Sequence, residues 1–176
     1  MSSRKRAPSR RFGRAASEPR LDPAQAADEG EIGAAAVALL ARRDYSSGEL
    51  TKKLRERGYS AAAVHAVVSD LIEHRFIDDA RYAAHFVSYH TERGHGPLRI
   101  RRDLAAFELE QTLIEQALAS EPDWARRARE VRIRKFGLTP PKSWQAKGKQ
   151  ARFLQYRGFS ADHIRSALGP DLDLDS

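Results

Sequence analysis

The side chains of this sequence that could do chemistry are histidines and adjacent acids near the middle of the chain. His85, His90 and His95 recur every five residues. At ~3.6 residues per helical turn, this spacing turns neighbouring side chains about 140° apart, so one helix could not direct them at a single metal ion. Asp78 and Asp79 form an acidic pair at a predicted helix start, where carboxylates more often cap the helix and oppose its dipole than catalyse a reaction.

Other signatures of catalysis and of cofactor binding are missing from the sequence. There is no phosphate-binding loop of the G-x-x-x-x-G-K-[ST] type and no nucleophile in a recognisable setting. Cysteine is absent, which excludes disulfides and thiolate zinc sites. We therefore expect no enzyme activity, no catalytic residues, no metal and no cofactor.

A stripe of cations near the C-terminus is the best candidate for a binding surface. In "RRAREVRIRK", residues 126–135, acids within four residues are scarce, so most of the cations should be unpaired and able to bind an anionic partner. A solvated helix face is the alternative. Trp144 could stack on a ligand, although core packing is at least as plausible for it. The ten candidate partner-binding or DNA-binding residues are Arg126, Arg127, Arg129, Arg132, Arg134, Lys135, Lys147, Lys149, Arg152 and Arg157.

The elements that must position these residues repeat with a period of 50. "LRERGYSAAAV" at residues 54–64 has a near copy, "LQYRGFSADHI", at 154–164, and "LAAFELEQTLI" at 104–114 keeps the apolar positions. Helical spacing within each copy predicts that these positions are buried. The aligned sets are Leu54, Leu104 and Leu154; Tyr59, Leu109 and Phe159; Val64, Ile114 and Ile164; and Val68, Leu118 and Leu168.

The residues between these apolar positions are typical of a helix, a tight turn and a second helix. Gly58 and Gly158 suit the position after a helix end that needs a positive φ, and Ser60 and Ser160 suit the next N-cap. Glu108 replaces the glycine in the middle copy, so we expect that turn to be built differently.

Signals for helix starts are also about 50 residues apart. Ser46 with Glu49 forms a capping-box pattern, and Gly96 with Pro97 supplies an N-cap and a first-turn proline. Asp78 is a plausible cap for a helix over 79–93, and another helix is expected over 33–43. With no alternating strand pattern, the expected fold is all-α: three tandem three-helix, helix-turn-helix-like repeats forming an elongated, curved, solenoid-like body.

Composition divides the chain into five segments. We expect a disordered tail at 1–31, basic and then acidic; repeats at 32–78, 79–121 and 122–168; and an acidic tail at 169–176. The three repeats carry seven bases and six acids, five and seven, and twelve and three, or +1, −2 and +9. This uneven charge favours an anionic partner for the third repeat. The apolar run at 32–41 is too short to span a bilayer and no longer run exists, so a soluble protein without a membrane partner is expected.

Four separated blocks of the sequence resemble the RecX family of bacterial recombination regulators over about residues 34–168. They are "LLARRDYSSGELTKKLRERGYS", "VVSDLIEHRFIDDARYAAHFV", "GPLRIRRDL" and "KGKQARFLQYRGFSADHI". Two local departures are Arg75, where the family usually has glycine, and "AAFEL" in the middle turn. The resemblance implies a cytoplasmic, non-enzymatic modulator of RecA that docks in the groove of the RecA filament on single-stranded DNA. It would inhibit recombinase, ATPase and coprotease activity, and so act in homologous recombination, DNA repair and the SOS response.

The hypothesis from the charges is that the near-neutral repeats contact RecA while the third repeat approaches DNA or an acidic protein face. We expect a monomer with weak, non-specific affinity for DNA alone. The alternative is a helix-turn-helix protein that binds DNA directly, without RecA.

Overall fold

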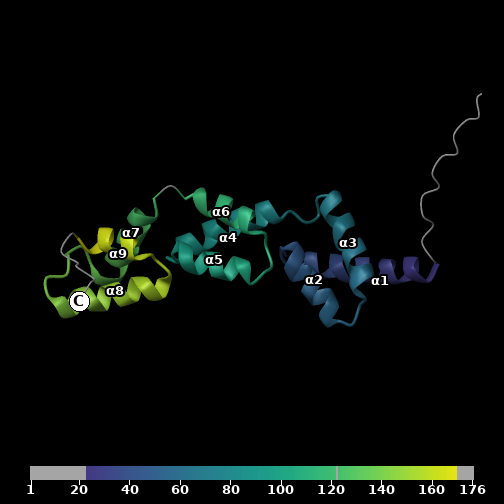
Figure 1. The fold of residues 1–176 in the computed structure, drawn as a ribbon, viewed down its shortest axis with the longest axis horizontal. Helices are drawn as coiled ribbons and strands as arrows, with labels where there is room; N and C mark the ends of the chain where they lie inside the picture. The colour runs from purple at the N-terminus through teal and green to yellow at the C-terminus, as the bar shows by residue number, and fades with distance from the viewer. Residues whose placement is uncertain (1–22, 122, 170–176) are drawn as a thin grey trace, which may run out of the picture.

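A computed structural model of the chain describes residues 23–121 and 123–169. Within these ranges the structure is entirely helical, as predicted, with nine α-helices and no strand (Figure 1). The helices are α1 (Pro23–Leu40), α2 (Ser47–Glu56), α3 (Ala61–Glu73), α4 (Asp79–Glu92), α5 (Pro97–Ala105), α6 (Gln111–Ala119), α7 (Trp124–Phe136), α8 (Trp144–Arg157) and α9 (Ala161–Leu168).

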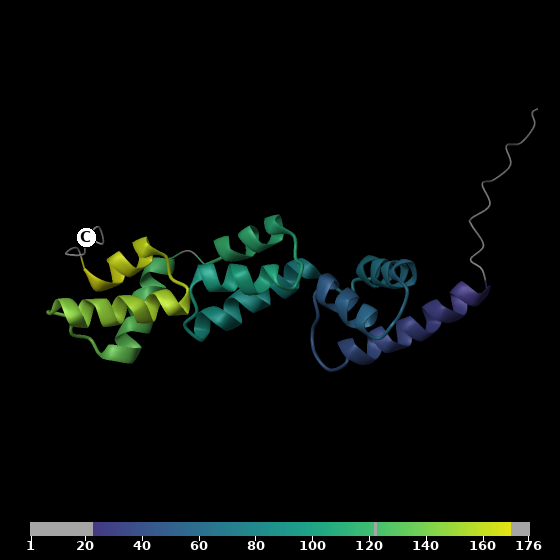
Figure 2. The same ribbon diagram turned by 60° about the horizontal axis from the view of Figure 1, so that its bottom comes forward.

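The helices form three units of three, which follow one another along the long axis of the molecule (Figures 1 and 2). In each unit the first and third helices make the most extensive contact: α1 with α3, α4 with α6, and α7 with α9. Each unit also has its own cluster of buried side chains. The expected series of three-helix repeats in an elongated body is therefore confirmed.

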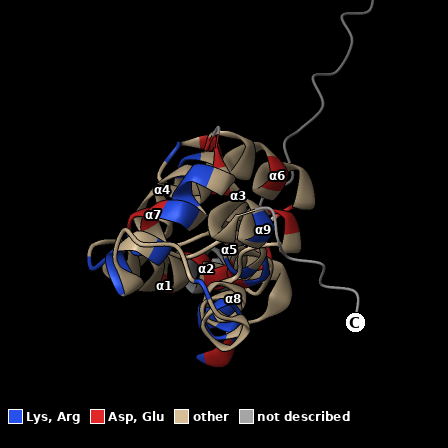
Figure 3. Ribbon diagram, turned by 90° about the vertical axis from the view of Figure 1, so that its left-hand side faces the viewer, with Lys and Arg blue, Asp and Glu red and all other residues tan. Residues whose placement is uncertain are grey.

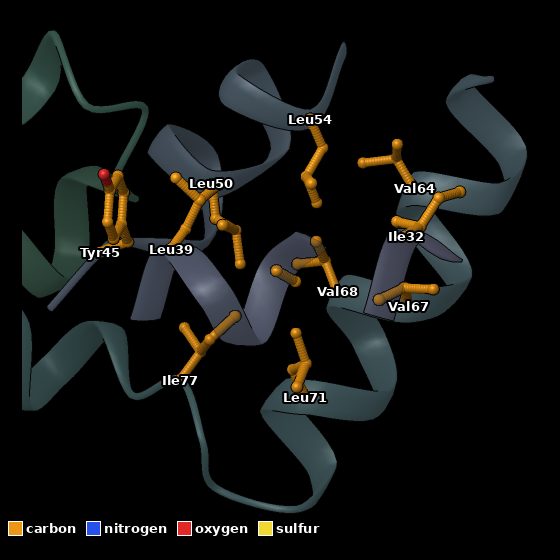
Figure 4. Close-up of a cluster of buried hydrophobic side chains, with 11 residues drawn as sticks. Ile32, Leu39, Tyr45, Leu50, Leu54, Val64, Val67, Val68, Leu71 and Ile77 are labelled. Atoms are coloured by element: carbon orange, nitrogen blue, oxygen red, sulfur yellow. The ribbon is translucent and has the colours of Figure 1, made fainter. Parts of the chain in front are cut away.

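The period of 50 residues correctly predicts the centre of each core. The leucines of the first aligned set, Leu54, Leu104 and Leu154, are fully buried. The other aligned positions are at most 7% exposed, apart from Tyr59, which is half-buried at the edge of its cluster. Figure 4 shows how the first core is assembled from the three helices of its unit and the segments beside them. Its labelled side chains are Ile32, Leu39, Tyr45, Leu50, Leu54, Val64, Val67, Val68, Leu71 and Ile77.

The middle turn corrects one prediction, because Glu108 does not change the way the turn is built. Gly58 and Gly158 have φ of +95° and +91°, and Glu108 adopts the same left-handed region with φ of +59°. The helix end requires this conformation in all three units, so the glutamate accepts a strain that glycine avoids. Arg75 is the other non-glycine residue with a positive φ in the described residues, at +60°.

The start of α1 corrects a second prediction, which placed residues 1–31 in a disordered tail. The helix already begins at Pro23. Low hydrophobicity suggested disorder, but the segment after Pro23 is rich in alanine, the strongest helix former, and Ile32 anchors the helix by being fully buried. The rest of the expected N-terminal tail, and the acidic C-terminal tail after residue 169, lie outside the described residues.

The predicted side-chain caps are confirmed at the starts of three helices. The side chains of Ser60, Asp78 and Ser160 accept hydrogen bonds from the amides of the first turns of α3, α4 and α9. Ser46 caps α2 in the same way, but Glu49 does not reach back to complete the box. Instead, Glu49 accepts two hydrogen bonds from Arg43, at 2.6 and 2.9 Å.

Candidate functional site

Neighbouring units are joined where the middle helix of one unit begins and the middle helix of the next unit ends in its left-handed turn. At the first joint, Ser46 Oγ donates to the carbonyl of Phe107 at 3.0 Å. At the second joint, the amide of Gly96 donates to the carbonyl of Arg157 at 2.8 Å. Ser46 and Gly96, like Phe107 and Arg157, are 50 residues apart, so the joint repeats together with the fold. These bonds connect each unit directly to the next.

Asp79 has a role at the first joint that sequence reasoning did not identify. Its carboxylate accepts hydrogen bonds from the amide and hydroxyl of Ser47, at 2.8 and 2.5 Å. Asp78 makes only the expected cap, to the amide of Arg81 at 2.9 Å. The pair thus has structural roles, and the link between Asp79 and Ser47 had no local signal because the two residues are 32 positions apart.

Two of the ten predicted cations are neutralised, while the other four cations of the stripe make no ion pair with a described residue, in line with the expectation that most of it is unpaired. Arg126 lies 2.7 Å from Glu130 and 3.6 Å from Glu121, and Arg127 lies 2.9 Å from Glu121 and 3.4 Å from Glu130. The hydrogen bond to Glu121 raises the pKa of Arg127. Counting acids within four residues missed Glu121, which lies before the start of α7. Arg126 and Arg127 are therefore poor candidates for contacting a partner.

Arg132 is also unavailable, because it is 3% exposed. Its guanidinium group donates to the carbonyl of Leu138 at 3.1 Å and to that of Thr139 at 3.2 Å. These two buried hydrogen bonds hold the segment between α7 and α8 against α7. The position is structural, and the predicted binding role for Arg132 is wrong.

The next two cations of the set lie at the second joint. Arg134 donates to the carbonyl of Glu92 at 3.4 Å, and Arg157 donates to the carbonyl of Arg93 at 3.1 Å. Both partners are neutral groups at the end of α4, so these contacts hold the guanidinium groups in place and leave their charge uncompensated.

The remaining accessible cations lie on the surface of the third unit. Arg129, Lys135, Lys149 and Arg152 are exposed and make no ion pair with any described residue. Lys147 is half-buried. Figure 3 views the end of the molecule formed by α7, α8 and α9, where the ribbon of α7 and α8 is coloured blue at Lys and Arg positions.

The outer face of α8 combines two of these cations with one exposed aromatic ring, and a second exposed ring lies next to it. The helix has four Lys or Arg residues and no acid. Lys149 and Arg152 share this face with Tyr156, which is 81% exposed, and Trp144, which is 66% exposed, lies at the start of the helix on the other side of Arg152. Trp144 is thus not a core residue, and Tyr156 is an addition to the predicted set. Cations beside exposed aromatic rings can bind phosphates and stack bases.

The structure corrects one detail of the argument that His85, His90 and His95 cannot bind one metal ion, because the three histidines do not lie on one helix. His95 lies beyond the end of α4, so the chain folds back and brings its Nδ1 to 2.9 Å from Nδ1 of His90. Burial lowers the pKa of both rings, to about 4 for His95, where Arg99 and His90 add to the effect. In the described part of the chain, no three or more potential ligands gather in a way that could hold a metal ion. Nor is any described helix long and apolar enough to cross a membrane.

Comparison with known proteins gives a consistent result for all three units. Family profiles for the first, second and third three-helix domains of RecX match residues 34–71, 78–118 and 121–168. Proteins named "Regulatory protein RecX" are similar along most of their length. The protein of Vibrio vulnificus is 39% identical over 77% of this chain and 90% of its own, and that of Pseudomonas putida is 43% identical over 78% and 90%.

Two solved structures have the same fold. The crystal structure of RecX from Lactobacillus salivarius superimposes with a TM-score of 0.71 at 21% identity, over 81% of this chain and 95% of that one. A crystal structure of a regulatory protein RecX gives a TM-score of 0.70 at 22% identity, over 82% and 73%.

Proposed function

The chain belongs to the RecX family, and on that premise we propose that it is a non-enzymatic, monomeric regulator of RecA in the cytoplasm. It binds in the groove of RecA filaments on single-stranded DNA and inhibits recombinase, ATPase and coprotease activity. In this way it modulates DNA repair and the SOS response. The near-neutral first and second units contact RecA, and the third unit faces the DNA backbone or an acidic protein surface.

The observation that carries this proposal is the placement of unpaired charge in an elongated molecule. The third unit has twelve bases and three acids, whereas the other two units are close to neutral. On the outer face of α8, Lys149 and Arg152 are exposed and have no described acid partner. Long-range attraction and counterion release would direct this end to a polyanion. Hydrogen bonds at both joints favour a body that spans neighbouring protomers as one piece.

The test uses charge reversal at residues that are not engaged in the fold. Lys149→Glu/Arg152→Glu should raise the amount of protein needed for half-maximal inhibition of ATP hydrolysis by preformed RecA filaments by roughly tenfold, because two phosphate contacts are lost. The comparison variant is Lys52→Glu/Arg55→Glu on α2, two exposed cations of the first unit that change the net charge equally. Because the first unit contacts RecA, both variants are also tested for binding to single-stranded DNA, which only the α8 variant should weaken. Equal loss of DNA binding in both variants would refute a specific role for the third unit.

Direct DNA binding without RecA is a second candidate function, favoured by one observation. Gln145 and Gln155 are exposed on the same face of α8 as Arg152, and side chains of these types can read base edges. This function predicts binding to particular duplex sequences in the absence of RecA. Equal affinity for unrelated duplexes would exclude it.

A further inference from the structure

A hollow at the joint between the second and third units has an entirely cationic and apolar lining. Its volume is about 240 Å³, well above the roughly 10–15 Å³ that a single water molecule needs by this measure. Among the residues that the structure describes, no acidic side chain lines it. The lining residues are Arg93 and Gly94 after α4, Val131, Arg134 and Lys135 of α7, and Phe153 and Arg157 of α8.

The guanidinium groups around the hollow are oriented by neutral partners. Arg134 and Arg157 donate to backbone carbonyls at the end of α4, and the Cζ of Arg93 lies 4.1 Å from the ring centroid of Tyr89. Carbonyl oxygens and aromatic rings restrict a guanidinium group without cancelling its charge. Lys135 is exposed and has no described acid partner. The four cations thus remain available to an anion, unlike Arg126 and Arg127.

The apolar part of the lining strengthens this attraction. Gly94, with φ of +77°, brings its backbone so close to α7 that a Cβ there would lie 2.9 Å from Cγ2 of Val131. Val131 is 7% exposed, and the half-buried ring of Phe153 completes this side. Charges act more strongly on an anion beside such apolar groups than in open water.

We propose that this hollow binds a backbone phosphate of a single-stranded nucleic acid. Because Arg93 belongs to the second unit and the other three cations to the third, a bound phosphate is held by both units and fixes their relative orientation. This site deepens the proposed function and rests on it for the source of the strand, which is the single-stranded DNA of the filament.

The surroundings of the hollow favour a polynucleotide over an acidic peptide. Lys149, Phe153 and Arg157 are spaced by four residues and form one row along α8, which leads from the hollow to the outer face of the helix. There Tyr156 exposes its ring, and the exposed ring of Trp144 lies at the start of the same helix. A single strand supplies both repeated phosphates and bases that stack on such rings, whereas an acidic peptide supplies only carboxylates.

The first experiment measures binding of a fluorescently labelled 20-nucleotide oligothymidylate to the full chain without RecA. Arg93→Gln and Lys135→Gln each remove one cation, from opposite sides of the joint, and neither side chain makes a hydrogen bond within the described residues. Each variant should lower the affinity about 3- to 10-fold and reduce the slope of log K against log salt by about 0.7. The control Lys52→Gln/Arg55→Gln should bind within about twofold of the unaltered chain.

A second experiment locates the bound strand by NMR. The amide signals of Gly94 and Phe153 should shift when the oligonucleotide is added, and inorganic phosphate should shift the same signals at higher concentration. Affinity unchanged in both Gln variants, or unshifted Gly94 and Phe153 signals, would overturn the site. Polyglutamate that binds at these residues as tightly as the oligonucleotide would overturn it too, by assigning the hollow to an acidic protein surface.

Failure of this site and failure of the proposed function give different results. If the oligonucleotide does not bind at the hollow but the chain still inhibits RecA, only the phosphate site is wrong. If the oligonucleotide binds there as expected but RecA filaments are unaffected, the site stands and the regulatory function is wrong.

Discussion

Gly96 and Gly158 meet backbone to backbone across the second joint. A Cβ on Gly96 would lie 2.4 Å from the carbonyl carbon of Gly158. At the first joint only the start of the middle helix has a glycine, because the turn carries Glu108: a Cβ on Gly48 would lie 2.6 Å from the Cβ of Glu108. The side chain that the middle turn carries is thus accommodated by a glycine in the neighbouring unit. At each joint, therefore, at least one of the two residues in contact must be a glycine.

This relationship predicts that two glycines of the same conformation differ in their cost of substitution. Gly58→Ala places a Cβ in open space, so its cost is that of the left-handed conformation, about 1–2 kcal/mol. Gly158→Ala has the same conformational cost, and its Cβ would also lie 2.4 Å from the Cβ of Arg99. We expect about twice the loss in the free energy of unfolding measured in urea, because overpacking adds ~1–3 kcal/mol. Equal losses would show that the second joint relaxes easily.

The sequence predicts the interior of each unit better than the contacts between units. Leu54, Leu104 and Leu154 are buried as expected because a helix places residues of fixed spacing on one face, which is a local rule. Gly96 and Gly158 are 62 residues apart in the sequence, and no local sequence pattern predicts that they are in contact. Sequence alone therefore predicts three similar units in series but not how they join.

The candidate site shows the same limit. Counting cations pointed to the third unit as a whole, but it could not separate neutralised Arg127 and buried Arg132 from exposed Arg152. Arg93 was missed because it belongs to a unit with a net negative charge. Only the folded chain brings it beside Lys135 at the hollow.

A second prediction concerns Gly148, in the middle of α8. A Cβ there meets nothing within 4 Å, and the residue has ordinary helical geometry. Gly148→Ala should raise the free energy of unfolding by about 0.5–1 kcal/mol, because alanine loses less backbone entropy in a helix. Thermal and urea unfolding should both register the gain. A loss of stability would mean that the space around Gly148 is needed when α8 packs.

Arg132 gives a third prediction, which separates structural from accessible cations. Arg132→Met keeps the bulk of the side chain but removes its hydrogen bonds to the carbonyls of Leu138 and Thr139. We expect a loss of about 1–2 kcal/mol in the free energy of unfolding, together with faster amide exchange between α7 and α8. Lys135→Met, at an exposed position of the same helix, should stay within about 0.5 kcal/mol of the unaltered chain. Similar effects of the two substitutions would contradict the structural role of Arg132.

The final prediction is a loss of stability in mild acid that depends on His95. Burial, with Arg99, His90 and Arg157 adding to it and Asp103 opposing it, lowers the pKa of His95 to about 4 from an ordinary value near 6.5. Between these values the unfolded chain binds more protons than the folded chain. The contribution of His95 is therefore complete above pH ~6.5 and is lost as the pH falls towards ~4.

Urea unfolding at pH 7.5 and pH 5 measures this contribution. The unaltered chain should lose more stability between the two values than His95→Asn, which has no imidazole to protonate. His85→Asn, which replaces an exposed histidine on α4, is the matched control and should lose as much as the unaltered chain. Because the ring of His95 is only partly buried, NMR titration of its carbon-bound protons gives an independent check. If this titration gave His95 an ordinary pKa, the expected difference between the variants would be contradicted.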